Sequence, residues 1–148
     1  MTKPPSDAIA LLQAAGFGWP ADARLVIGSL GARLVGFLAR LWDAPPAAVT
    51  LGRTVFVPDA AYFARLGPVE QAALLAHEAV HIRQWQQMGA WGFLRRYWRE
   101  YLRTRREGIA THDPLRGIDL EREAIAVEDR VRLALVALLG QPPTLPAG

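Results

Sequence analysis

The segment from Gly67 to Gly89 constrains the fold most, because its pattern indicates one long helix that is partly buried. It opens on Gly67-Pro68, where proline suits a first helical turn, and Glu70 follows at a position that the helix dipole favours. Gly89 is expected to end the helix. The run LLAHEAVHIRQW, residues 74–85, lies in its middle and places three polar residues among apolar ones.

These polar residues, His77, Glu78 and His81, form the pattern H-E-x-x-H. Residues four apart share one face of a helix, so the two histidines project side by side. This is an arrangement in which imidazoles bind zinc, and a catalytic zinc site adds a third protein ligand and an open position for water. Glu78 is placed to act as the general base toward that water. The alternative is a buried helix whose histidines are hydrogen-bonded within the core.

The third ligand is expected to be a glutamate from a later segment. The chain has no cysteine, and Gln84 and Gln87 stand where a metzincin would carry its glycine and third histidine. The glutamates that follow the motif are Glu100, Glu107, Glu121, Glu123 and Glu128. Glu121 and Glu123 flank the apolar stripe of the last expected helix on opposite sides, so periodicity leaves both open.

Composition indicates one ordinary domain spanning residues 1–148. The chain is 51% hydrophobic, enough to bury a substantial core, and shows no internal repeat. No secretory signal is recognisable, and the absence of cysteine fits a reducing compartment. The longest apolar region, residues 25–42, is interrupted by arginine and is not expected to span a membrane. We therefore expect a cytoplasmic protein.

The coarse pattern predicts an α+β fold that is mostly helical. Residues 1–23 are broken by proline and glycine and predict a poorly ordered lead-in, and residues 140–148 predict a frayed tail. The run VTLGRTVFVPD, residues 49–59, predicts an edge strand or a small hairpin sheet packed on the motif helix. Helices are expected at residues 24–42, 67–89, 91–106 and 119–139.

The expected helix 91–106 is both basic and aromatic. Seven arginines lie between residues 83 and 106 against one acid, Glu100. The favoured interpretation is an aromatic stripe that closes the core while arginines stay in water. A membrane-surface helix is the second interpretation. Nucleic-acid binding is not expected, because no reading motif accompanies the charge.

The motif and its surroundings resemble a known family. LLAHEAVHIRQW resembles the H-E-x-x-H-x-x-Q helix of gluzincin-type zinc metallopeptidases, the minigluzincins. It is also similar to the peptidase-like core domain of extracellular contractile injection systems. AVTLGRTVFVP resembles the strand before the zinc helix, and DPLRGIDLEREA resembles the downstream segment that supplies a glutamate ligand. The likeness covers residues 47–129, within a metallopeptidase-like core expected at 47–139.

The resemblance implies the rest of a zinc site. In the family's E-x-x-A-D run the ligand corresponds to Glu121, with Ala124 matching. Ile125 stands at the place of the aspartate, which would orient a ligating histidine, and this departure keeps Glu123 as the alternative ligand.

The resemblance also implies a peptidase that hydrolyses a peptide or protein with a water nucleophile. Its strand would pair with an extended substrate through Thr54, Val55, Phe56 and Val57. A donor for the oxyanion is also needed, and the sequence does not rank the candidates Tyr97, Tyr101, His112 and Arg116. The alternative function is a catalytically inactive zinc-binding interaction module on the same scaffold, with the membrane surface as a further partner of residues 91–106.

Overall fold

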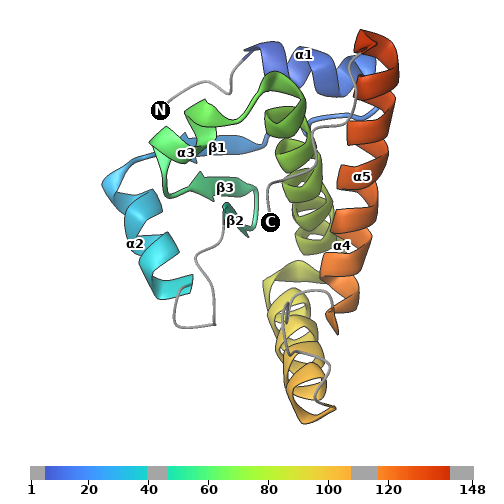
Figure 1. Ribbon diagram of the computed structural model, residues 1–148. Helices are drawn as coiled ribbons and strands as arrows, with labels where there is room; N and C mark the ends of the chain where they lie inside the picture. Colours follow the sequence, from blue (N-terminus) through green and yellow to red (C-terminus); the bar gives the residue numbers. More distant parts are fainter. Residues whose placement is uncertain (1–5, 40–46, 108–116, 141–148) are drawn as a thin grey trace.

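The computed structural model describes residues 6–39, 47–107 and 117–140, and its arrangement is mostly helical with one small sheet (Figure 1). The elements in chain order are α1 (Ser6–Ala14), β1 (Arg24–Ile27), α2 (Leu30–Ala39), β2 (Val49–Leu51), β3 (Thr54–Val57), α3 (Ala60–Arg65), α4 (Pro68–Arg106) and α5 (Asp119–Leu139). The α+β class is confirmed. Residues 1–5, the tail 141–148, and His112 and Arg116 lie outside the described residues.

The three strands form one sheet in the order β1-β3-β2. β1 runs parallel to β3, with Arg24 opposite Thr54, and β2 runs antiparallel to it, with Leu51 opposite Thr54. Gly52, at φ 63°, takes the left-handed conformation needed in the two-residue turn between β2 and β3. β3 is therefore the central strand, and the prediction that Thr54–Val57 is an edge strand is wrong. Both of its sides are already paired, so it cannot pair with a substrate.

The edge-strand prediction failed because residues 24–42 were expected to form one helix. The first four of them form β1, and the helix α2 begins only at Leu30. Val26 and Ile27 are β-branched and favour a strand, and Gly28, at φ 62°, ends it. The resulting strand occupies the side of β3 that would otherwise be open.

The N-terminal segment contains a packed helix, contrary to the prediction of a poorly ordered lead-in. Residues 6–14 form α1, and Ala8 and Leu12, one turn apart, are buried against α4 and α5. Gly16 and Gly18, two of the helix breakers that suggested disorder, lie beyond the end of this helix. They follow a short helix rather than prevent one.

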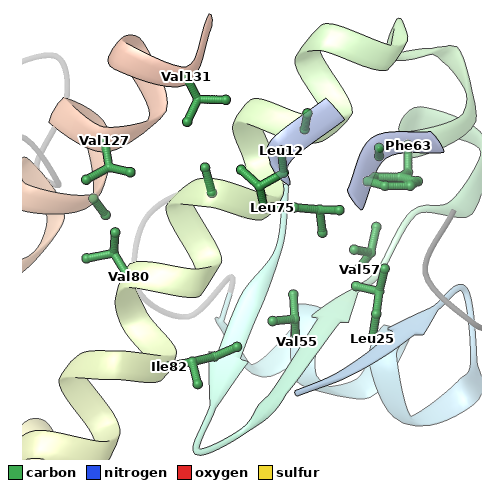
Figure 2. Close-up of a cluster of buried hydrophobic side chains, with 14 of the residues drawn as sticks. Leu12, Leu25, Val55, Val57, Phe63, Leu75, Val80, Ile82, Val127 and Val131 are labelled. Carbon is green, nitrogen blue, oxygen red and sulfur yellow. The ribbon is translucent and has the colours of Figure 1, made fainter. Parts of the chain in front are cut away.

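The main core lies between the sheet and the first half of α4 (Figure 2). Along β3, burial alternates, and Val55 and Val57 are both fully buried on the face turned toward α4. Leu75 and Ile82 of α4 are fully buried in the same cluster. Full burial of such a side chain contributes about 1.5–3 kcal/mol, so this layer fixes the sheet against the motif helix.

α2 contacts β2 and β3 through small residues. Ala32 and Gly36 are its buried positions, and a Cβ at Gly36 would lie 2.5 Å from the ring of Pro58. Larger apolar residues such as Leu30 and Leu34 are exposed. Across the described residues, no helix has both the length and the apolar character needed to cross a membrane.

α4 consists of two helical stretches that meet in a kink at Gly89, whose φ of 69° and ψ of 168° are not helical. This conformation is essentially restricted to glycine. Gly89, which was predicted to end the motif helix, therefore divides α4 into two halves, 68–88 and 90–106. These halves correspond to the two helices expected at residues 67–89 and 91–106.

We expect Gly89→Ala to destabilise the protein by about 1–3 kcal/mol, because alanine cannot adopt this backbone conformation without strain. The measurement is chemical denaturation of the variant beside wild type. Gly18→Ala is the matched control, since Gly18 has an ordinary φ and open space around its Cβ position. Equal stability of all three proteins would contradict the role given to Gly89.

Candidate metal centre

Three side chains from two helices converge on one point between α4 and α5. His77 and His81 come from the first half of α4, and Glu121 comes from the first turn of α5. Their facing nitrogens, His77 Nε2 and His81 Nε2, are 3.1 Å apart. Glu121 Oε2 lies 3.2 Å from the first nitrogen and 3.3 Å from the second. The three atoms form a nearly equilateral triangle that could hold a metal ion.

The size of this triangle fits zinc. Ligand atoms bound tetrahedrally at about 2.0–2.1 Å from zinc lie roughly 3.3 Å from one another. The observed separations of 3.1–3.3 Å match this spacing without movement of any helix. With three protein ligands among the described residues, a fourth tetrahedral position would remain for another ligand.

Each histidine is oriented by a hydrogen bond from its other ring nitrogen. His77 Nδ1 lies 3.0 Å from Glu128 Oε2, and His81 Nδ1 lies 2.9 Å from Gln84 Oε1. Both partners accept hydrogen bonds, so each Nδ1 carries a proton, and each Nε2 can direct a lone pair to the centre of the triangle once any proton there is displaced. This is the tautomer that a metal ligand needs.

Glu128 is the functional residue whose role the sequence did not reveal. It was a candidate for the third ligand, while the loss of the orienting aspartate at Ile125 remained without compensation. Glu128 lies seven residues, or about two turns, after Glu121 and so shares its face of α5. That spacing is the sequence signal that could have identified it. Arg132 holds it in place at 2.7 Å and also binds Glu70 of α4.

The structure separates Glu121 from the other candidates for the third ligand. Glu123 Oε2 accepts a hydrogen bond of 2.8 Å from Gln84 Nε2, on the outer side of His81. Glu100 is buried and binds Arg96 and the backbone N–H of Leu120 at the start of α5. Glu107 is exposed at the end of α4. Gln84, which stands at the metzincin glycine position, thus holds the ring of His81 in place.

The centre has a strong affinity for positive charge. Burial opposes a charge on His77, but its hydrogen bonds with Glu121 and Glu128 outweigh this effect and raise the pKa of His77 to about 10. The pKa of His81 is also raised despite burial, chiefly by Glu121. Burial would raise the pKa of Glu121, yet hydrogen bonds from the two histidines lower it far below its ordinary value. A divalent cation would satisfy the same charges.

Glu78 lies beside this triangle without belonging to it. It is buried, and its Oε2 accepts a hydrogen bond of 2.5 Å from the hydroxyl of Thr50 on β2. Its charge nevertheless reaches the centre, because it contributes to raising the pKa of His77, His81 and Tyr97. A carboxylate that is close to the ligands but held by a different element can handle protons there.

Tyr97, from the second half of α4, contacts the metal centre through Glu121. Its hydroxyl donates to Glu121 Oε1 at 3.1 Å, and burial raises the pKa of Tyr97 well above its usual range, so the hydroxyl stays protonated. Its ring stacks on Phe93, whose ring in turn contacts His81 edge-on. The bend at Gly89 therefore returns the second half of α4 to the metal centre.

The centre has a small opening to solvent, since the side chain of His77 is 15% exposed. A surface hollow of about 930 Å³ lies elsewhere, between α2 and α3, and none of the residues of the metal centre lines it. Arg33 and Asp59 are the charged residues that line it, and they do not form a metal-ligating set. The candidate site is therefore defined by the chemistry of its side chains and not by the volume of a hollow.

No protein-family model, curated protein or solved structure matches this chain. Its function is therefore inferred from the geometry of this centre.

We expect Glu121→Gln to lower zinc affinity by more than about 100-fold. Loss of a residue that only orients a ligand lowers metal affinity by about 10–100-fold, and loss of the ligand itself should have a larger effect. Glu123→Gln is the matched control, since an amide oxygen can still accept from Gln84. The measurement is zinc content by elemental mass spectrometry and competition with a chelating dye. Loss of zinc in the Glu123 variant alone would reverse the assignment.

Zinc binding is also expected to release protons at pH 7. The raised pKa of His77, about 10, means that it holds a proton at neutral pH before metal binds, and zinc must displace that proton. Apparent affinity should therefore rise with pH across the neutral range, by about tenfold per pH unit for each displaced proton. Calorimetry in buffers of different ionisation enthalpy counts the protons. Binding without proton release would contradict this protonation state.

Proposed function

We propose that this chain is a zinc-dependent peptidase that hydrolyses peptide bonds in a peptide or protein substrate. A zincin-like fold of the minigluzincin type is part of the proposal. The observation that supports it most is that the candidate metal ligands and the candidate base are different residues at one site. His77, His81 and Glu121 form the triangle. Glu78 remains outside it, held by Thr50 on a different element. A purely structural zinc site would use a fourth protein ligand and needs no adjacent base.

A bound zinc ion would supply Lewis acidity, which activates water and polarises the substrate carbonyl. The residues of the chain then handle protons and position. Glu78 accepts a proton from the attacking water and transfers it to the departing amine nitrogen. The water oxygen forms a bond to the carbonyl carbon, the carbon–nitrogen bond breaks, and the products are a carboxylate and an amine. Thr50 keeps Glu78 aligned for both transfers.

Peptide binding is proposed along β2 rather than β3. Within the described residues, β2 pairs with β3 alone, so the opposite edge of Val49–Leu51 carries no strand. Thr50 on this strand reaches Glu78, which places the edge next to the base. An extended peptide added there would bring its backbone to the centre through main-chain hydrogen bonds.

A second candidate function is a zinc-binding interaction module without catalysis. The observation that favours it is the Tyr97 hydroxyl, which donates to Glu121 rather than pointing to a substrate. A hydrolase needs a donor for the oxyanion beyond the metal. If Tyr97 serves that purpose, it must leave Glu121 when substrate binds. A protein that holds zinc and cleaves no peptide in a broad library would favour this second candidate.

Glu78→Gln is the decisive substitution for the peptidase proposal. We expect it to keep zinc but to lower the hydrolysis rate by about 10²–10⁴-fold, because the amide cannot accept the proton from water. The amide retains an oxygen that can accept from Thr50, so folding should change little. The measurements are zinc content and cleavage of an unstructured peptide library, read by mass spectrometry.

Glu107→Gln provides the matched control, since it makes the same change at an exposed glutamate at the end of α4. It should cleave like wild type. Undiminished cleavage by the Glu78 variant, with zinc still bound, would exclude Glu78 as the base.

A further inference from the structure

The second half of α4 presents large apolar side chains to solvent. Trp91 is 77% exposed, Leu94 is 50% exposed and Trp98 is 45% exposed. Their spacing of three and four residues places them on one face of the helix. The sequence favoured an aromatic stripe that closes the core, but the side chains that do so are Phe93, Tyr97 and Tyr101. The exposed set forms an outer face of α4, and its Trp98 ring also stacks on Tyr101 of the inner set.

Charge on this outer face has one sign. Arg95 and Arg99 follow Trp91 at intervals of four residues and are exposed beside the tryptophans. The single acid in residues 91–106, Glu100, is buried on the opposite side of the helix and binds Arg96. The outer face of α4 therefore combines two tryptophans, a leucine and arginines with no carboxylate among them.

The position of this half of α4 leaves the outer face accessible. Figure 1 shows residues 90–106 projecting away from the sheet and beyond the start of α5. The inner residues Phe93 and Tyr97 hold the segment to α5 through Ile118 and Leu120. A rigid helix with its polar and aromatic sides fixed in this way can lie along a flat surface without refolding.

We propose that the outer face of α4 docks on an anionic lipid bilayer, with the helix lying in the plane of the headgroups. The tryptophan rings would sit at the level of the headgroups, where their apolar rings and indole N–H groups are both satisfied. The guanidinium groups of Arg95 and Arg99 would meet lipid phosphate and carboxylate groups. Nucleic acid would account for the arginines alone, whereas a bilayer accounts for the arginines and the apolar stripe together.

Docking would orient the metal centre but does not depend on catalysis. Adjacent residues of this helix serve the two sides, with Tyr97 bonded to Glu121 and Trp98 exposed on the outer face. The same rigid segment therefore connects the bilayer surface to the centre. An inactive zinc module would dock equally well, so failure of the peptidase proposal and failure of docking are distinguishable.

The test is cosedimentation of the full chain with phosphatidylcholine vesicles that contain or lack phosphatidylserine. Wild type should bind the anionic vesicles, bind neutral ones weakly, and dissociate as salt screens the charges. Arg95→Gln with Arg99→Gln should weaken binding roughly 25-fold, since each arginine near such a surface contributes about fivefold. Trp91→Ala with Trp98→Ala should weaken it by at least about tenfold through loss of buried apolar area.

Two control pairs keep the interpretation specific. Arg24→Gln with Arg65→Gln removes the same charge from exposed arginines on β1 and α3, and Leu133→Ala with Leu138→Ala removes exposed apolar residues from α5. Both pairs should bind vesicles like wild type. Circular dichroism and zinc content verify that each variant is folded.

Three outcomes would overturn the proposal. The first is no binding to anionic vesicles by folded wild type. The second is binding that the control pairs weaken as much as the outer-face pairs, which would indicate nonspecific charge. The third is binding that needs the arginines but not the tryptophans and that a single-stranded oligonucleotide competes for fully, which would indicate a nucleic-acid surface.

Discussion

The packing of α5 against the first half of α4 supports every part of the metal centre. It brings Glu121 to the two histidines and places Glu128 behind His77. The register between the helices is held by apolar contacts within the main core and by Arg132, which binds Glu128 on its own helix and Glu70 on the other. Since one helical turn is about 5.4 Å, a shift of one turn would separate ligands that now lie 3.1–3.3 Å apart.

The fold also buries charge in and near the centre, and each of the three buried carboxylates among the described residues has a partner. Glu121 is bonded by the histidines and Tyr97, Glu78 by Thr50, and Glu100 by Arg96. A buried carboxylate without such partners would cost several kcal/mol. The lowered pKa of Glu121 and the raised pKa of His77 reflect the same compensation, in which the site attracts protons or a metal cation into its centre.

The two halves of α4, which meet at Gly89, face different parts of the molecule. Its first half faces the sheet and supplies the histidines and Glu78, and its second half faces α5 with Tyr97 and faces outward with Trp91 and Trp98. A straight helix would carry its second half along the original axis. The glycine-only backbone at residue 89 redirects it, so that an aromatic layer covers His81 while a basic aromatic face remains outside.

Features that depend on local spacing could be predicted from the sequence alone. They include the pairing of His77 with His81, the division at Gly89 and the bounds of the last helix, which follow from intervals of three to four residues and from the preferences of glycine and proline. The remaining features depend on tertiary contacts. The central place of β3 depends on a partner strand thirty residues earlier, and the choice of Glu121 over Glu123 depends on how α5 is rotated against α4. Such contacts join segments far apart in the chain, and periodicity along one segment carries no information about the register of another.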